Sequence, residues 1–228
     1  MTGHSRFVAV IVSAIAVLVP LTAAAQVWDL NVYGGWSYSH LSGNRTALAD
    51  GQYKSGFGGG VGAELQLNED WGWEFGLWYV QKGTKGTMTF REDDPAFFPR
   101  PSETFAGNIN LDYVEVPILV NVYFPVGDNA DIRGYVGPTF SFLTRAKADG
   151  TSGGTKVDED VRNLFDDADF TVVIGAGGKW EFNRVDFLID IRWDIGATNV
   201  SNVNEAELRT NTLLITAGVG IPLMAGEE

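Results

Sequence analysis

Apolar and polar residues alternate along eight segments of this 228-residue chain. In the first segment, large apolar side chains fall at Leu30, Val32 and Trp36, and polar or small ones fall between them. The same alternation recurs in residues 56–67, 71–82, 114–124, 132–142, 170–182, 185–195 and 212–221. A period of two is the side-chain period of a β-strand. The pattern therefore predicts about eight strands of roughly 10–12 residues, the length that a tilted strand needs to cross a bilayer.

The connections between these segments alternate in length. Residues 68–70, 125–130 and 183–184 are short, whereas residues 39–55, 83–109, 146–168 and 196–209 are long and polar. Short turns on one side and long loops on the other are typical of outer membrane barrels. We therefore predict an all-β fold, a closed antiparallel up-and-down transmembrane β-barrel of about eight strands, with both termini on the short-turn side.

The orientation of the apolar face decides between two kinds of barrel. A soluble lipocalin-like barrel shows the same period, but its apolar face points inward around a ligand. Side-chain volume favours a lipid-facing orientation, because six tryptophans share the apolar face and a narrow barrel cannot hold them inside. The opposite face carries small residues and charges of both signs, which suit a cramped polar lumen. We predict structural lumen charges at Glu64, Glu74, Glu115, Arg133, Lys179, Asp190 and Arg192.

The first 25 residues have the composition of a cleaved signal peptide. His4 and Arg6 give a polar start, residues 7–19 are an apolar core, and residues 23–25 are an Ala-Ala-Ala cleavage site. The apolar run is short for a membrane-spanning helix, which needs about 20 residues. We expect secretion through the inner membrane and a mature barrel domain over residues 26–228.

A glycine-rich stretch, GFGGGVGAEL from Gly56, contains the spacing of a dinucleotide-binding turn. That motif also requires a following helix and an acidic residue about 20 positions later. Here the next residues alternate as in a strand, so we assign Gly56, Gly58, Gly60 and Gly62 to the lumen face. We expect them to leave space for bulky neighbours such as Trp78 or Tyr135, or to relieve strand curvature. We predict no cofactor.

Composition and charge exclude several other functions. The chain has no cysteine, which excludes disulfides and thiolate chemistry. A net charge of −13 argues against a nucleic-acid partner, because phosphate binding needs basic patches. The acidic runs at residues 91–95, 157–160 and 165–169 lack the ligand spacing of a calcium loop, so we interpret them as solvated charge rather than a metal site.

Enzymatic chemistry has little support in the sequence. His40 is the one histidine after the leader, and it lies in the first predicted loop between Ser39 and Ser42. A catalytic base needs a nucleophile within hydrogen-bond reach, and sequence adjacency does not supply that geometry. Lumen charges could instead form an ion or proton path, but eight strands leave no open channel. We predict that the protein is not an enzyme.

Two motifs resemble one known family. YVEVPILVNVYF, from Tyr113 to Phe124, resembles the Tyr-x-Glu-x-Pro strand of the PorT-like outer membrane β-barrel family, and FGLWYVQKGTK from Phe75 is similar to its preceding strand. The resemblance covers nearly all of the mature chain. It implies an integral outer membrane barrel of Bacteroidota-like bacteria, and one member group is linked to protein secretion. It carries over no catalytic residue, and it implies structural roles for Glu115 and Pro117.

The sequence supports three functional hypotheses. The first is a non-enzymatic outer membrane barrel that acts through its long extracellular loops, in binding, envelope integrity or secretion. Its partners would be outer membrane lipids, the outer membrane assembly machinery and an unknown extracellular ligand. The alternatives are a soluble periplasmic lipocalin-like carrier and an outer membrane lipid-modifying enzyme that uses His40. The chain ends GVGIPLMAGEE rather than on an aromatic residue, so we expect non-standard assembly or a tail beyond the last strand.

Overall fold

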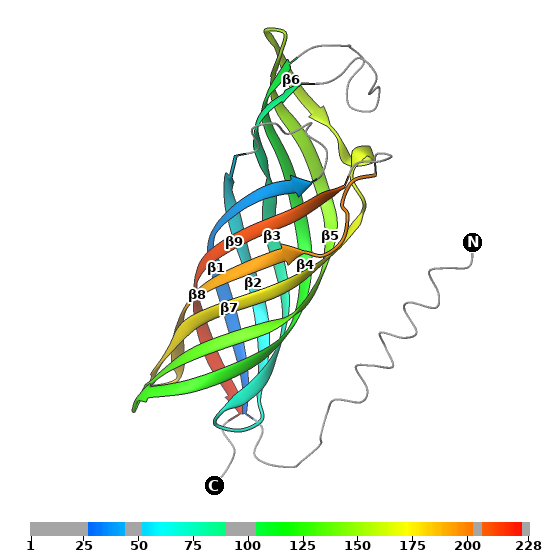
Figure 1. Cartoon of the computed structure of the whole chain (residues 1–228). Helices are drawn as coiled ribbons and strands as arrows, with labels where there is room; N and C mark the ends of the chain where they lie inside the picture. The colour runs from blue at the N-terminus through cyan, green and yellow to red at the C-terminus, as the bar shows by residue number, and fades with distance from the viewer. Residues whose placement is uncertain (1–26, 44–51, 90–103, 203–206, 225–228) are drawn as a thin grey trace, which may run out of the picture.

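The structure, a computed structural model, describes residues 27–43, 52–89, 104–202 and 207–224. These residues form nine strands and one short 3-10 helix (Figure 1). The elements are β1 (Val27–Gly43), β2 (Lys54–Gln66), β3 (Trp71–Thr89), β4 (Thr104–Gly127), β5 (Ala130–Ser152), β6 (Thr155–Asp160), η2 (Arg162–Leu164), β7 (Ala168–Phe182), β8 (Val185–Gly196) and β9 (Leu208–Met224). The predicted signal peptide and the last four residues lie outside this range.

Eight of the strands close into an antiparallel barrel. The hydrogen-bonded order runs β4-β3-β2-β1-β9-β8-β7-β5, and pairing between β4 and β5 completes the ring. β6 pairs with β5 alone, so it lies outside the ring as an extension of the sheet. The predicted all-β, up-and-down barrel of about eight strands is confirmed.

The three short connections fall at one end of the barrel, which we call the short-turn end. They span residues 67–70, 128–129 and 183–184, at the three predicted places, although the second is shorter than the predicted 125–130. The side-chain oxygen of Asn68 accepts hydrogen bonds from the backbone N–H groups of Asp70 and Trp71, both at 2.9 Å. Asn183 has a φ of 59°, a left-handed conformation that asparagine tolerates better than most residues. The described chain also begins and ends here, because Trp28 pairs with Met224.

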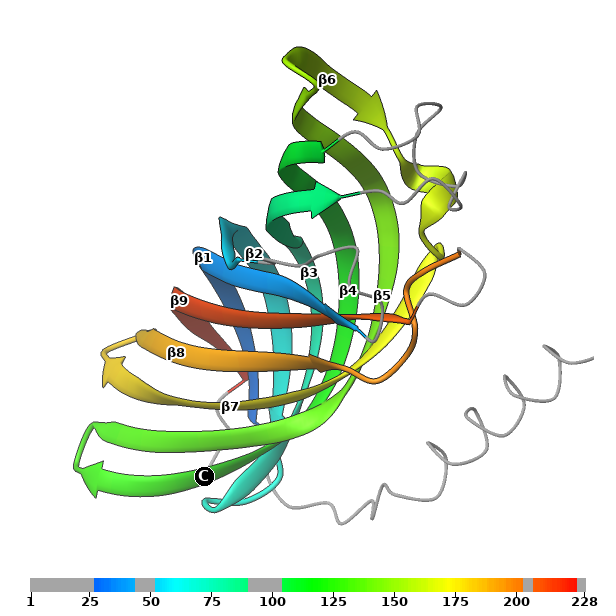
Figure 2. The same cartoon turned by 45° about the horizontal axis from the view of Figure 1, so that its top comes forward.

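The strands are longer than predicted, and the difference is concentrated at the opposite, extended end. β4 has 24 residues and β5 has 23. The predicted loop over 146–168 is therefore wrong for most of its length, and the predicted loop over 83–109 is wrong at 83–89 and 104–109, while residues 90–103 lie outside the described residues. β3, β4, β5 and β6 continue as a sheet beyond the other strands (Figure 2). A continuous antiparallel ladder pairs residues 84–89 with 104–109 and residues 105–112 with 145–152.

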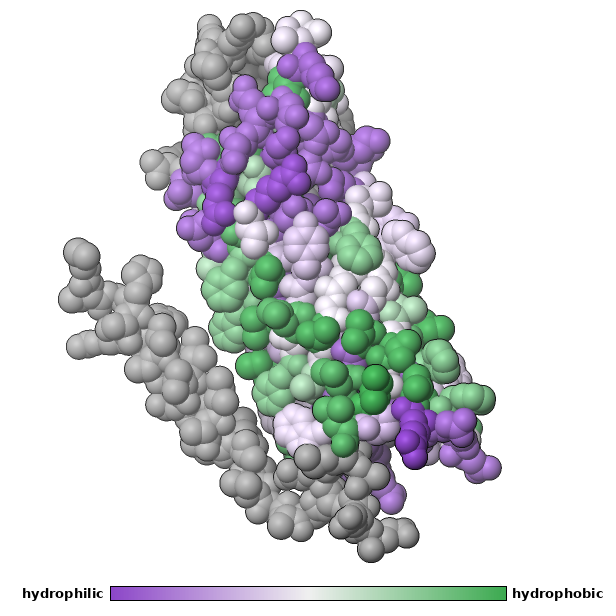
Figure 3. Space-filling model, turned by 180° about the vertical axis from the view of Figure 1, so that it is seen from behind, coloured by the Kyte–Doolittle hydropathy of each residue, from purple (hydrophilic) through white to green (hydrophobic). Residues whose placement is uncertain are grey.

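The outer surface of the barrel is an apolar belt. Outward-facing residues such as Val32, Leu77 and Ile189 are about half exposed, and they alternate with buried polar ones. A space-filling view shows this apolar belt below a polar band at the extended end (Figure 3). A lipocalin-like carrier would bury these residues around its ligand, so the lipocalin alternative is not favoured. Within the described residues, no helix is both long and apolar enough to cross a membrane.

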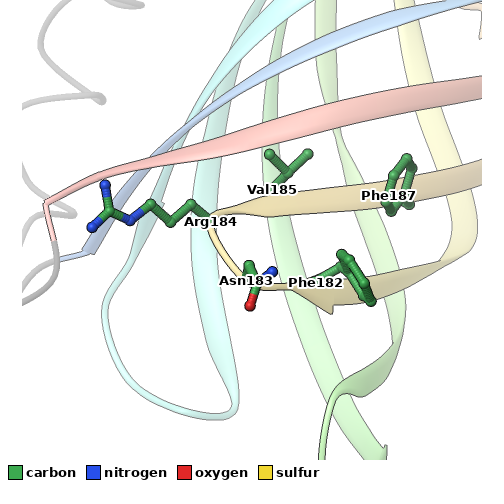
Figure 4. A pocket seen from close by; sticks show the side chains of 5 residues that line it. All are labelled: Phe182, Asn183, Arg184, Val185 and Phe187. Atoms are coloured by element: carbon green, nitrogen blue, oxygen red, sulfur yellow. The ribbon is translucent and has the colours of Figure 1, made fainter.

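The short-turn end carries aromatic and basic side chains at the edge of the belt. A shallow hollow at the β7–β8 turn is lined by Phe182, Asn183, Arg184, Val185 and Phe187 (Figure 4). The Arg184 side chain extends away from the two phenylalanine rings (Figure 4). An aromatic ring beside a long basic side chain suits the boundary between acyl chains and water.

The lumen glycines have a packing role. A Cβ built on Gly60 would lie 2.6 Å from both the Leu77 carbonyl oxygen and the Trp78 ring, so only glycine lets that indole fold over β2. Tyr135 occupies the equivalent space above Gly175 on β7. The expected packing of Trp78 against a glycine of β2 is therefore present, between the neighbouring strands β3 and β2. Tyr135 instead packs against Gly175 of β7.

Candidate functional site: the filled lumen and its cap

Three clusters of buried charged side chains fill the lumen. The first lies nearest the short-turn end and is centred on Lys179 of β7. Its ammonium nitrogen is 2.8 Å from Asp29 Oδ2 and 3.2 Å from Asp186 Oδ2. These three side chains come from β7, β1 and β8, so one lysine connects strands that are far apart in sequence.

The second cluster is centred on Arg133 of β5, which is almost fully buried. Its guanidinium donates two hydrogen bonds to Asp190, at 2.9 and 2.8 Å, in a bidentate arrangement. It also donates to Glu74 Oε2 and to the Tyr33 hydroxyl, both at 3.0 Å. This arginine therefore connects β5 to β8, β3 and β1 across the lumen.

Glu64 extends the second cluster toward the first. Its carboxylate lies 3.7 Å from Arg133 and accepts hydrogen bonds from Asn31, at 3.1 Å, and from the Tyr123 hydroxyl. The carboxylate thus has three partners on β5, β1 and β4. Pairing of this density is what buried carboxylates require, because an unpaired buried charge is strongly destabilising.

The third cluster lies closer to the extended end and is centred on Arg192 of β8. Its guanidinium donates to both oxygens of Asp194, at 2.6 and 3.0 Å, and to Glu115 Oε2 at 2.8 Å. The other oxygen of Glu115 lies 2.6 Å from Lys82 Nζ. The indole of Trp78 separates this cluster from the second, since Arg192 lies 5.0 Å above its ring and Tyr33 stacks on it at 5.0 Å.

An apolar cluster closes the lumen above the third charge cluster, and we call it the cap. Its residues come from β1, β4, β5, η2, β9 and the segments beside η2: Leu41, Phe105, Ile109, Leu111, Tyr113, Leu143, Ala146, Ala148, Val161, Leu164, Phe165, Val200 and Leu208. Backbone hydrogen bonds hold the covering segments in place, among them Val161 N–H to Ala146 O at 3.1 Å and Asn202 N–H to Leu164 O at 3.0 Å. The cap is an ordered apolar core where the sequence predicted solvated loops.

All seven predicted lumen charges are buried inside the barrel, in all three clusters. Four charged partners outside the predicted set of seven complete the pairs: Asp29, Lys82, Asp186 and Asp194. Sequence alternation already places Asp29, Asp186 and Asp194 on the polar face. Lys82 could have been found, because alternation from Glu74 through Trp78 places it on the same face. Alternation also places Tyr33 and Tyr123 on the polar face, but it does not indicate that their hydroxyls pair with Arg133 and Glu64.

His40 lies apart from these clusters, near the extended end of β1. Its ring is 4.5 Å from the Tyr53 ring, and burial lowers its pKa below the usual range. Among the described residues, its Nδ1 atom has no hydrogen-bond partner. No group of three or more metal-ligating side chains occurs in the part of the chain that the structure describes. Within the described part of the chain, no partner therefore orients this ring through Nδ1 in the way that a catalytic base is oriented.

A closed antiparallel barrel with an apolar outer belt and a charge-filled lumen defines the class of outer membrane β-barrels. A family model described as outer membrane protein beta-barrel domain matches residues 24–202. The chain belongs to this family. No curated protein matches the sequence.

Several solved structures are similar to the chain at low sequence identity. Neisserial surface protein A (NspA) is 14% identical, with 84% of this chain and 96% of that chain covered and a TM-score of 0.45. OprG from Pseudomonas aeruginosa is 11% identical, with 89% and 99% covered and a TM-score of 0.45. A major outer membrane protein from Thermus thermophilus is 11% identical, with 88% and 100% covered and a TM-score of 0.48.

Proposed function

We propose that this protein is a non-enzymatic integral outer membrane protein that acts through its extended end, in binding or in envelope structure. The observation that carries the proposal is the combination of a filled lumen and a built extended end. Three charge clusters and the cap occupy the barrel interior, and β3–β6 form an ordered sheet outside it. The extended end faces the cell exterior in this proposal, because outer membrane barrels place their short turns in the periplasm.

The finer family assignment and the route to the membrane are part of the same proposal. The motif from Tyr113 to Phe124 lies in β4 and supports PorT-like membership, with an envelope or secretion-associated role. In that motif Pro117 is buried and Glu115 anchors Lys82 and Arg192, which supports structural roles for both motif residues. The leader over residues 1–25 would direct export, and the assembly machinery would insert the barrel.

Two measurements test the proposal. Outer membrane fractionation, with heated and unheated gels of the purified protein, should give an outer membrane band with a heat-dependent shift. Reconstitution into planar bilayers should give no stepwise conductance, because paired charges and the apolar cap leave no water-filled path. Recovery in the soluble periplasmic fraction, or steady single-channel currents, would contradict the proposal.

The enzymatic alternative has its own test. The protein and its His40→Ala variant are incubated with a panel of outer membrane lipids, and the products are separated by mass spectrometry. We expect no modified lipid from either protein. A product formed by the parent protein and lost in the variant would establish an enzyme and overturn the non-enzymatic assignment.

A further inference from the structure

The outward surface of β3, β4 and β5 changes from apolar to polar at one row of the sheet. Tyr79, Val114 and Phe142 are register neighbours in the last apolar row. The next outward row is Gln81, Asp112 and Arg145. This change marks the upper boundary of the lipid-facing belt on this side of the barrel.

These three strands continue past that boundary and, with β6, form what we call the outer wall. The outer wall is the outward face of residues 81–87, 105–112, 145–152 and 155–160. One register row across it consists of Lys85, Asn108, Asp149 and Asp158. The opposite face of β4 and β5 packs into the cap, and Val157 of β6 packs against it. The strands of the outer wall continue from those of the barrel as one sheet (Figure 2).

A groove of about 370 Å³ lies in the outer wall, between Gln52 and the strands β3 and β4. The side chains of Gln52, Lys85, Thr87 and Asn108 line it, together with Ala106 and two glycines. The two glycines add no side chain to the groove. Asn108 is held in place, because its Nδ2 atom donates to Asp149 Oδ2 at 3.0 Å. Among the described residues, none donates a hydrogen bond to its side-chain Oδ1 atom, which can therefore accept one from a ligand.

The basic side chains of the outer wall differ in how far they are already paired. Lys147 is 2.5 Å from Asp158, and Arg145 is 3.8 Å from Asp112. Within the described residues, Lys85 makes no such ion pair. The groove thus offers one available ammonium group among amide and hydroxyl groups.

We propose that this groove binds a negatively charged sugar in the headgroup of an outer-leaflet glycolipid. Amide and hydroxyl groups match the alternating donors and acceptors of a sugar ring, and the Lys85 ammonium pairs with a phosphate or carboxylate substituent. The inference deepens the proposed function and rests on its membrane orientation. It assigns the extended end a lipid partner from the membrane in which the barrel stands.

The height of the groove above the belt selects a glycolipid over a phospholipid. Lys85 is six residues beyond Tyr79 on β3, which corresponds to about 20 Å along the strand. With the usual tilt of outer membrane strands, this becomes roughly 15 Å along the membrane normal. The headgroup layer of a phospholipid leaflet is only about 5–8 Å thick. A lipid whose acyl chains lie on the belt below therefore reaches the groove only through a saccharide.

The test compares the parent protein with Lys85→Ala/Asn108→Ala and with Arg209→Ala. Arg209 is an exposed cation on β9, at the same end of the barrel but away from the outer wall, so it controls for the loss of one charge. Binding is measured in detergent micelles against four probes: lipopolysaccharide with a phosphorylated core, lipid A without the core, phosphatidylglycerol, and the free core oligosaccharide. Heated and unheated gels of each sample report barrel folding separately.

We expect the parent protein and the Arg209→Ala control to bind the complete lipopolysaccharide at least about tenfold more tightly than the other three probes, and the double variant to lose about tenfold. Equal binding of lipid A or phosphatidylglycerol, equal binding of the free oligosaccharide, or an unaffected double variant would each overturn the inference. These outcomes leave the proposed barrel intact if the gel shift is present. A parent protein without a gel shift would refute the proposed function itself.

Discussion

The substitution Arg133→Met tests whether the lumen is a dry, paired network. Arg133 is 2% exposed and makes four hydrogen bonds, two to Asp190, one to Glu74 and one to the Tyr33 hydroxyl. Methionine keeps much of the aliphatic volume but removes the charge and every donor. The variant therefore removes the cation that three buried carboxylates share, those of Glu64, Glu74 and Asp190, while the apolar packing changes little.

The expected loss of stability follows from those stranded charges. Removing one partner of a buried ion pair costs about 3–5 kcal/mol. We therefore expect a loss of about 3–5 kcal/mol at pH 7.

The measurement is equilibrium unfolding by urea in phospholipid vesicles, followed by tryptophan fluorescence and gel shift. Arg145→Met is the matched control, because its pair with Asp112 is long and its side chain is 57% exposed. It should cost no more than about 1 kcal/mol. A triple variant that adds Glu74→Gln and Asp190→Asn should recover most of the lost stability. An Arg133→Met loss as small as that of the control would refute the dry lumen and indicate a hydrated one.

Three further tests, two of them with a matched control substitution, address other features of the barrel. Gly60→Ala should lower the free energy of unfolding in urea by about 1–3 kcal/mol, because the new Cβ would overlap the indole of Trp78. Gly134→Ala is the control: no atom lies within 4 Å of its Cβ position, so it should be neutral or stabilise by up to about 1 kcal/mol. Equal effects of the two substitutions would contradict the packing role of Gly60. Ile189→Arg, in the middle of the belt, should lower the free energy of unfolding in vesicles by about 2–4 kcal/mol. Val126→Arg, at the edge of the belt, should lower it by at most about 1 kcal/mol. Equal losses in the two variants would contradict the lipid exposure of the belt. Leu111→Ala, in the cap, should lower the local stability of the cap by about 2–5 kcal/mol. We expect faster amide hydrogen exchange in the cap, while the heated and unheated gels still show a folded barrel. Unchanged exchange would show that the cap is not a cooperative core.

Alternation made the barrel predictable within the membrane but not beyond it. From Trp71 to Lys82 every position has one fixed side, because lipid lies outside the strand and the packed lumen inside. Beyond Lys82 the period is interrupted. Gly83 has a φ of 135°, and the register between β4 and β5 shifts at Asp112. Such irregularities reset which side a residue faces, so the polar sequence of the extended strands looked like a loop.

The candidate site was also predictable only in part. Charges such as Glu74 and Arg192 could be placed inside the barrel, because the side of a strand follows from counting along it. Their pairing could not be predicted, because it depends on register between strands far apart in sequence. Glu115 and Lys82, for example, meet only when β3 and β4 align Trp78 with Glu115. The cap was missed for the same reason, since its residues come from six separate segments.

The division of the interior into charged clusters and an apolar cap has a physical reason. Inside the membrane, the outer face already uses the large apolar residues, so the lumen is filled with small residues and paired charges whose hydrogen bonds hold distant strands together. Beyond the membrane, water replaces lipid outside the sheet, and apolar side chains gain by turning inward. Phe105 and Leu111 on β4 are therefore buried inside, whereas Phe75 and Leu77 on β3 face lipid. The same sheet thus reverses its polarity at the membrane boundary, and that reversal leaves a polar outer wall available for binding.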